Sequence, residues 1–275
     1  MTVLVYGSLV PDIVFTVPRL PQAGEDVPGR SVEVVAAGGG GNVAVALAGW
    51  GFEVMAVGNT VGTDPLGRSV EAAFRQLGID TPAGLVVAGA TTPANAIIVT
   101  PDGERTIIGS DYASVTWLAV PGWDGVTAVL VDGYSGPAGA AVIEAAAARG
   151  LPVVGTDRVG PGTRDLTVLM WSADEHPDPE EAARTAAGGP TVVVTNGPHP
   201  IEVYRRDGST FQVVPAARAA GDSTGAGDVF AAAVTAGLAE GLAVSHALER
   251  ATDVAARFVS TGRASGVPPL TRLDS

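Results

Sequence analysis

The stretch from Ala128 to Gly155, AVLVDGYSGPAGAAVIEAAAARGLPVVG, decides the fold class. A short apolar run, Ala128–Asp132, is followed by a helical pattern from Pro137 to Arg149 that Gly150 ends, and then by a second apolar run, Val153–Gly155. Short, branched runs of this kind are typical of strands that are covered on both faces. A strand, a helix and a strand in this order predict two parallel strands joined by a crossover helix.

The same alternation extends along most of the chain. Further runs of strand length are Val3–Tyr6, Val54–Val57, Thr167–Trp171 and Val192–Thr195. The pairs Asp64-Pro65 and Asp178-Pro179 each combine an N-cap residue with proline at the first helical position, which predicts two more helices. We therefore expect an α/β fold, a doubly wound and mostly parallel sheet, in a single domain over residues 1–275.

Two segments, approximately residues 13–36 and 94–110, interrupt the alternation. The first is extended and rich in proline, and in the second Pro101-Asp102-Gly103 separates two apolar runs, which is a hairpin signature. Both are too short for a domain, so they predict a small β-sheet lid on the main domain. Short edge strands can be covered by another subunit, and a homodimer through the lid is therefore expected.

The composition excludes several classes of chemistry. Among 275 residues there are 29 acidic and 16 basic side chains, the net charge is -13, and Cys and Lys are both absent. Without Lys, a Walker A loop and Schiff-base chemistry are excluded. Without Cys, disulfides, thiolate nucleophiles and Cys-ligated metals are excluded. The acidic balance argues against a nucleic-acid partner.

The sequence also argues against a membrane partner. The N-terminus, MTVLVYGS, has no basic segment and predicts a first strand in place of a signal peptide. An uncharged stretch from Val34 to Phe52 contains four consecutive glycines and an asparagine, which does not fit a spanning helix. We expect a cytoplasmic protein.

The strongest chemical signal is the segment Gly221–Phe230, GDSTGAGDVF, which leads into an alanine-rich helix. Small residues at Gly225–Gly227 let successive amides point at one position where a helix begins, and this makes an anion site without any cationic side chain. Asp228, in the first helical turn, would then lie beside the anion and accept a proton from an attacking hydroxyl. A plain glycine-rich loop with Asp228 as a helix-dipole partner is the alternative.

A second signal is Gly38–Leu47, in which four glycines precede Asn42. The glycines indicate a close backbone approach, and the Asn42 amide would face hydroxyl groups; a flexible turn with Asn42 as the N-cap is the alternative. A dinucleotide fingerprint fails because Val43 occupies the last glycine position, which argues against a dinucleotide-dependent oxidoreductase. A third signal is Gly7-Ser8 with Asp12 after the first strand, although such an aspartate is usually an ordinary turn residue.

Together these motifs resemble the ribokinase-like (PfkB) carbohydrate kinase family over nearly the whole chain. Gly221–Phe230 is similar to the C-terminal signature of that family, and Asn42 with Ala44 and Gly51 is similar to its N-terminal signature. The resemblance implies a doubly wound sheet with a β lid. It also implies transfer of the γ-phosphoryl group of ATP to a hydroxyl of a sugar, with Mg²⁺.

The resemblance also implies roles for individual residues. Asp228 would be the catalytic base, and the amides of Gly225, Ala226 and Gly227 would form the anion hole. Sugar hydroxyls would be held by Asp12, Gly38, Gly39 and Asn42. The nucleotide would be bound by Thr195, Gly197 and Ser223 together with the anion-hole glycines. Glu175 would act on Mg²⁺ indirectly, and Asp222 and Thr224 would contribute to a monovalent cation site for K⁺.

The sequence departs from the family pattern at three positions. Ser172 replaces the usual Asn three residues before Glu175, Ala37 stands where Gly is common, and Pro200 stands where a loop usually closes with Gly. A nucleoside kinase of the same fold and a non-catalytic sugar-binding protein remain open. Few aromatic side chains fall in the predicted lid, with Phe15 the clearest, and this favours a sugar over a nucleoside. An acidic sugar would need a cation, for which Arg30 and Arg105 are the candidates.

Overall fold

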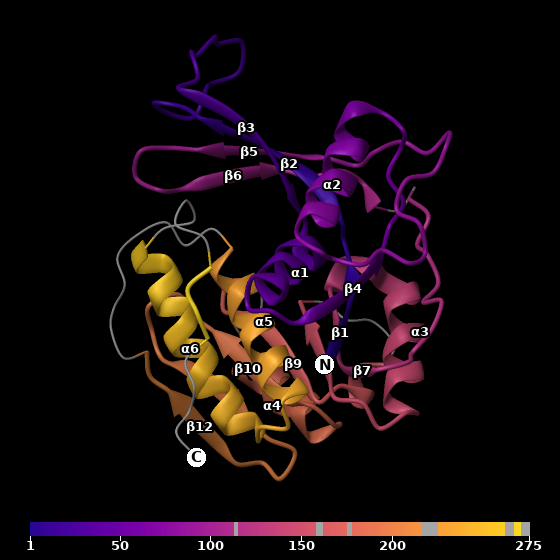
Figure 1. The fold of residues 1–275 in the computed structure, drawn as a ribbon. Helices are drawn as coiled ribbons and strands as arrows, with labels where there is room; N and C mark the ends of the chain where they lie inside the picture. Colours follow the sequence, from indigo (N-terminus) through magenta and orange to yellow (C-terminus); the bar gives the residue numbers. More distant parts are fainter. Residues whose placement is uncertain (113–114, 158–161, 175–177, 216–224, 262–266, 271–275) are drawn as a thin grey trace.

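Eight strands form the large sheet of the computed structural model, which describes residues 1–112, 115–157, 162–174, 178–215, 225–261 and 267–270 (Figure 1). The strand order is β12-β11-β10-β9-β8-β7-β1-β4. The strands are β1 (Thr2–Gly7), β4 (Glu53–Gly58), β7 (Val126–Val131), β8 (Val153–Thr156), β9 (Val168–Ser172), β10 (Thr191–Thr195), β11 (Ile201–Tyr204) and β12 (Thr210–Val213). The six strands predicted for this sheet are all present and are parallel to one another. The antiparallel pairs β10–β11 and β11–β12 extend the sheet at one edge.

Helices cover both faces of this sheet. The helices α1 (Gly39–Gly49), α2 (Pro65–Gln76), α5 (Ala226–Ala239) and α6 (Val244–Thr261) contribute to one core, and α3 (Gly136–Ala147) and α4 (Pro179–Ala187) to the other. Strand β1 contributes to both cores: Val3 and Val5 face the first core, whereas Leu4 and Tyr6 face the second. The period of two along a strand thus requires apolar side chains at every position when both faces are covered. The predicted doubly wound fold is confirmed.

The predicted helix starts are confirmed at the level of single hydrogen bonds. The Asp64 carboxylate accepts from the amides of Leu66 (3.0 Å) and Gly67 (3.1 Å), and the Asp178 carboxylate accepts from the amide of Glu180 (2.9 Å). Pro65 and Pro179 each occupy the first turn. An N-cap of this type stabilises a helix by about 1 kcal/mol. The third predicted helix, α3, also forms, and Gly150 beyond its end has φ of +70°.

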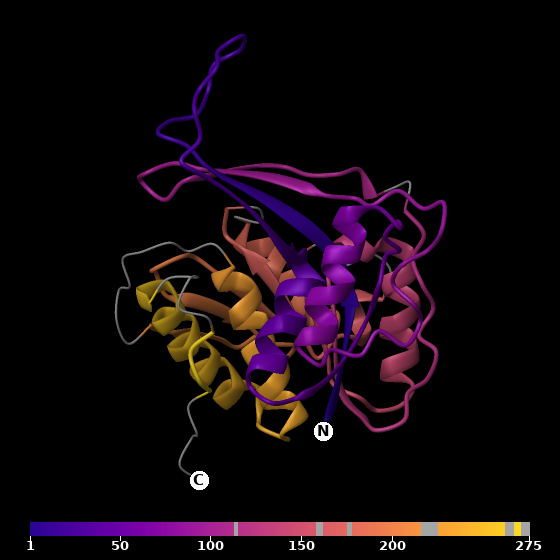
Figure 2. The same ribbon diagram turned by 45° about the horizontal axis from the view of Figure 1, so that its top comes forward.

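A second, smaller sheet has the strand order β3-β2-β5-β6 and is called the lid sheet below. Its strands are β2 (Val10–Thr16), β3 (Ser31–Ala37), β5 (Asn95–Val99) and β6 (Arg105–Ile108). Strands β5 and β6 form the predicted hairpin, and β2 pairs with β5 in parallel. Figures 1 and 2 show the lid sheet beyond one end of the large sheet, above α1 and α5. The expected small β lid is confirmed.

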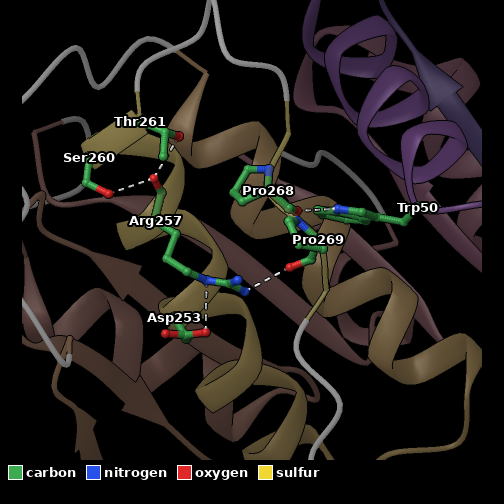
Figure 3. A network of polar contacts seen from close by, with 7 residues as sticks. All are labelled: Trp50, Asp253, Arg257, Ser260, Thr261, Pro268 and Pro269. Carbon is green, nitrogen blue, oxygen red and sulfur yellow. Dashed lines mark hydrogen bonds and ion pairs between the residues drawn. The ribbon is translucent and has the colours of Figure 1, made fainter.

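A C-terminal segment, Val267–Leu270, ties the two ends of the fold together. The indole of Trp50, at the end of α1, donates to the Pro268 carbonyl (2.7 Å), and Arg257 of α6 donates to the Pro269 carbonyl (2.8 Å) (Figure 3). Val267 and Leu270 pack against the first core. The segment therefore contacts both α1 and α6 and holds these two helices in place relative to each other.

The uncharged stretch from Val34 to Phe52 folds into part of β3, helix α1 and the turn that follows it. In the part of the chain that the structure describes, the helices lack the length and hydrophobicity needed to span a bilayer.

Candidate active site

Helix α5 begins at Ala226, directly after Gly225, and its first turn carries Asp228. Gly225 has φ of +82°, a conformation that favours glycine, and this turn directs the chain into the helix. The first amides of a helix have no partner within the helix, and the helix dipole favours an anion there. The helix predicted from the sequence is thus present, with small residues and an acid at its start. Residues 221–224, with Asp222, Ser223 and Thr224, lie outside the described residues.

The start of α1 faces the start of α5. The side-chain amide of Asn42 donates to the Asp228 carboxylate at 2.7 Å, although the two residues are 186 positions apart in the sequence. The alternative in which Asn42 caps the helix is wrong, because the N-cap is Gly38 and Asn42 lies within the first turns. The structure therefore brings two independently predicted motifs into direct contact.

The four consecutive glycines allow α1 to approach the chain's own backbone. A Cβ at Gly38, which has φ of +84°, would lie 2.4 Å from the Ser8 carbonyl oxygen, and one at Gly40 would lie 3.0 Å from the Gly7 backbone. The Gly41 amide also donates to the Ser8 carbonyl (3.0 Å). The close approach that the sequence predicted is therefore explained by the turn between β1 and β2.

Asp228 has the electrostatic setting of a proton acceptor near neutral pH. The pKa of its carboxyl is raised from the usual 3.8 to about 7, chiefly by burial and also by the nearby charges of Asp157 and Asp132. The hydrogen bond from Asn42 and the positive charge of Arg105 act in the opposite direction and lower this pKa. Arg105 belongs to β6, so the lid sheet contributes a positive charge that acts on the Asp228 carboxyl at the start of α5.

Asp12 lies on β2 of the lid sheet, directly opposite Asn95 of β5. It is buried, and its carboxylate accepts from the side-chain amide of Asn95 on the neighbouring strand β5 (2.9 Å). Asn95 is also hydrogen-bonded to Tyr112, whose pKa is raised to about 12, chiefly by burial and further by the charges of Asp132 and Asp12. Asn95 and Tyr112 were missed from the sequence, because only the strand pairing brings them to Asp12.

Asp132, at the end of β7, was recognised only as the end of a strand. It is fully buried, and its carboxylate accepts from the Ser8 amide (2.5 Å), the Ser8 hydroxyl (2.7 Å), the Gly40 amide (3.2 Å) and the Tyr134 amide (3.2 Å). Its position could have drawn attention, because ligands of open α/β sheets bind beyond the carboxyl ends of the strands.

Two of the residues predicted to bind the nucleotide lie at the carboxyl end of β10: Thr195 is its last residue, and Gly197 follows it. The Thr195 hydroxyl donates to the Trp171 carbonyl (3.2 Å), and Gly197 has φ of +51°. Ser172 ends the neighbouring strand β9, and Glu175 lies outside the described residues. No cluster of three or more metal-ligating side chains occurs among the residues that the structure describes. The nucleotide and metal assignments stay predictions.

Comparison with known proteins identifies the family. The model of the pfkB family of carbohydrate kinases matches residues 2–151 and 156–269. The ribokinase of Lactococcus lactis is 27% identical over 99% of this chain and 96% of its own length. That of Haemophilus influenzae is 34% identical, but over only 39% of this chain and 35% of its own length. The ribokinase of Cryptococcus neoformans, solved with ADP, is 25% identical and superposes with a TM-score of 0.75 over 98% of this chain and 97% of its own.

The family match extends beyond the two signature motifs to nearly the entire chain, and the solved relative shares the fold over 98% of this chain. The family expected from the motifs, and with it the carbohydrate-kinase class, is therefore confirmed: this chain belongs to the pfkB family of carbohydrate kinases.

Proposed function

We propose that this protein transfers the γ-phosphoryl group of ATP to a hydroxyl group of a sugar, with Asp228 as the general base. The observation that carries the proposal is the 2.7 Å hydrogen bond between Asn42 and Asp228, which joins the starts of α1 and α5. A carboxyl whose pKa is about 7 can accept a proton from a hydroxyl and release it again near neutral pH.

The proposed reaction balances in one step. The acceptor oxygen forms a bond to the γ-phosphorus, its proton moves to a carboxylate oxygen of Asp228, and the bond from that phosphorus to the β–γ bridging oxygen breaks to release ADP. The amides of Gly225, Ala226 and Gly227 would donate to the non-bridging oxygens of the moving group, where negative charge gathers. Asp12, Gly38, Gly39 and Asn42 would hold the acceptor hydroxyls.

For the binding of ATP and of the ions, the described part of the site contains Thr195 and Gly197, whereas Glu175, Asp222, Ser223 and Thr224 lie outside it. Thr195, Gly197 and Ser223 would contact the nucleotide. Mg²⁺ is usually held by one or two carboxylates together with phosphate oxygens, so a site with Glu175 as an indirect contributor suits it, and it would neutralise phosphate charge. Asp222 and Thr224 would hold K⁺.

The test is release of ADP from ATP and Mg²⁺ across a panel of aldoses, ketoses, sugar acids and nucleosides. We expect a signal that depends on the acceptor and names its class. If no acceptor raises ADP release but a sugar raises the melting temperature, the protein is a sugar-binding protein and the proposed transfer is wrong.

One observation favours a nucleoside as a second candidate acceptor. Tyr112 lies with its ring centroid 5.4 Å from that of Tyr134 and 6.4 Å from that of Trp117, beside the Asp12–Asn95 pair. Tyr134 is 59% exposed. The scarcity of aromatic residues in the lid therefore does not describe the whole site, because these rings come from outside the lid segments. A nucleobase could stack on such a ring.

The nucleoside candidate is tested with Tyr134→Ala. A nucleoside acceptor would lose about 1–3 kcal/mol of binding free energy, as is usual for loss of base stacking. Free ribose, which has no base, would bind the variant and the wild-type protein equally. Equal KM changes for ribose and nucleoside would remove the stacking role.

The outer face of the lid sheet supports the proposed homodimer. The strand register places Ile13, Phe15, Val32, Val34 and Ile108 on one face, opposite to the face of Asp12 and Asn95. Val32 is 59% exposed, Val34 48% and Ile108 62%. An exposed apolar face of this kind is typical of an interface. Light scattering should give twice the monomer mass, and Val34→Asp should give the monomer; a wild-type monomer would contradict the dimer.

A further inference from the structure

The buried carboxylate of Asp132 forms no ion pair with a basic side chain among the described residues. It accepts hydrogen bonds from three separate segments. These are the turn after β1, the first turn of α1 and the 3₁₀ turn η2 (Gly133–Ser135). A buried carboxylate is costly unless hydrogen bonds satisfy it, and here four donors do so. Its backbone amide donates to the Tyr6 carbonyl (3.0 Å), which fixes the residue to β1.

The surrounding chain is shaped to admit this carboxylate. A Cβ at Gly7 would lie 2.5 Å from the Asp132 Oδ2 atom, and one at Gly39 would lie 3.1 Å from it. The Ser8 hydroxyl extends the contact, because it donates to Asp132 and accepts from the Gly39 amide at 2.9 Å. One carboxylate thus sets the distance between the β1–β2 turn and the start of α1.

These two segments carry the residues that would hold the acceptor. Gly39 and Asn42 belong to α1, and β2, which follows the turn at Ser8, carries Asp12. We propose that Asp132 is a positioning residue for the acceptor: it holds the start of α1 against the β1–β2 turn and so sets the geometry between Asp12, Gly39 and Asn42. The inference rests on the proposed function for its link to the acceptor, but the contacts themselves do not.

The carboxylate has two unequal sides, which gives a graded test. Oδ2 accepts three hydrogen bonds, from the Ser8 amide, the Ser8 hydroxyl and the Gly40 amide, whereas Oδ1 accepts one, from the Tyr134 amide. In Asp132→Asn the side-chain carbonyl can take the Oδ2 position and keep three of these donors. Asp132→Ala loses all of them, and Ser8→Ala loses the hydroxyl that bridges to Gly39.

The experiment compares these variants in the full-length protein, with Thr252→Ala as control. Thr252 is also buried, and its hydroxyl donates to the Leu248 carbonyl within α6, so its loss lowers stability without touching the start of α1. We expect the acceptor KM to rise by about tenfold in Asp132→Asn and Ser8→Ala, and by about a hundredfold in Asp132→Ala, as for lost hydrogen bonds to a charged group. The KM for ATP should stay within about twofold, since no ATP contact is assigned to these residues.

Hydrogen exchange separates this inference from the proposed function. In Asp132→Ala, which loses the contact to the Gly40 amide, the amides of residues 39–42 should exchange faster, while those of α4 stay unchanged, whether or not any acceptor is turned over. A wild-type protein without kinase activity would end the proposed function and leave this readout intact. The positioning role is overturned if exchange at residues 39–42 is unchanged, or if the acceptor KM stays at the wild-type value while the melting temperature falls as in Thr252→Ala.

Discussion

At the scale of single residues, the central pair is Asn42 and Asp228. The pKa of Asp228 is raised to about 7, chiefly by burial, and the hydrogen bond from Asn42 keeps this pKa from rising further. The base is active only when ionised, so kcat/KM should rise with pH and level off above about 7. Asn42→Ala should move this rise to higher pH, measured as a pH–rate profile.

The control for that profile is Arg184→Gln, because Arg184 is an exposed residue of α4 whose ion pairs are with Asp178 and Glu180. Its pH dependence should match that of the wild-type protein. A rise at the same pH in Asn42→Ala and in the wild-type protein would show that the hydrogen bond does not set the pKa of Asp228.

The same pKa predicts a gain in stability when Asp228 is replaced. The carboxyl binds its proton more tightly in the folded state, where its pKa is about 7, than in the unfolded state, where its pKa is near 3.8. The wild-type protein therefore loses stability as the pH rises from near 3.8 to about 7. Asp228→Asn removes this loss. Its melting temperature should exceed that of the wild-type protein by more at pH 8 than at pH 5, and an equal difference at both pH values would contradict the assignment.

At the scale of elements, α1 contains a matched pair of glycines. A Cβ at Gly40 would press on the Gly7 backbone at 3.0 Å, whereas a Cβ at Gly49 would meet no atom within 4 Å. Gly40→Ala should therefore cost about 1–3 kcal/mol of unfolding free energy, as overpacked sites do, and weaken acceptor binding. Gly49→Ala should be neutral or stabilise by up to about 1 kcal/mol. Urea unfolding and calorimetric binding measure both effects, and equal costs in the two variants would contradict this packing.

The C-terminal segment that joins α1 to α6 gives a second element-scale prediction. Trp50 and Arg257 donate to adjacent carbonyls, those of Pro268 and Pro269 (Figure 3). Trp50→Phe and Arg257→Met should each lower the unfolding free energy by about 1 kcal/mol, the usual worth of one hydrogen bond. The double variant should lose less than the sum, because either change frees the same segment. Strict additivity would show that the two contacts are independent.

At the scale of the whole molecule, the local sequence patterns were sufficient to predict the parallel part of the large sheet. Buried strands carry apolar residues at every position, and the Asp-Pro helix starts are strong local signals, so both were read correctly. The edge strands β11 and β12 were not predicted, because each has only four residues. Their alternation of more and less buried residues is too short to stand out in the sequence.

The site was only partly accessible from the sequence. Asp12, Asn42 and Asp228 belong to motifs, and each stands out locally. Asn95 and Tyr112 depend on the pairing of β2 with β5, and the role of Asp132 depends on β7 lying beside β1. These are long-range contacts, which no short segment encodes.

The measurement that tests the central claim most directly is turnover in Asp228→Asn, with acceptor binding measured in the same protein by calorimetry. The substitution keeps the shape of the side chain, and its amide oxygen can still accept from Asn42, but it cannot take a proton from the acceptor hydroxyl. We predict a loss of about 10²–10⁴ in kcat with acceptor affinity close to that of the wild-type protein. Turnover within a few-fold of wild type would show that Asp228 is not the general base.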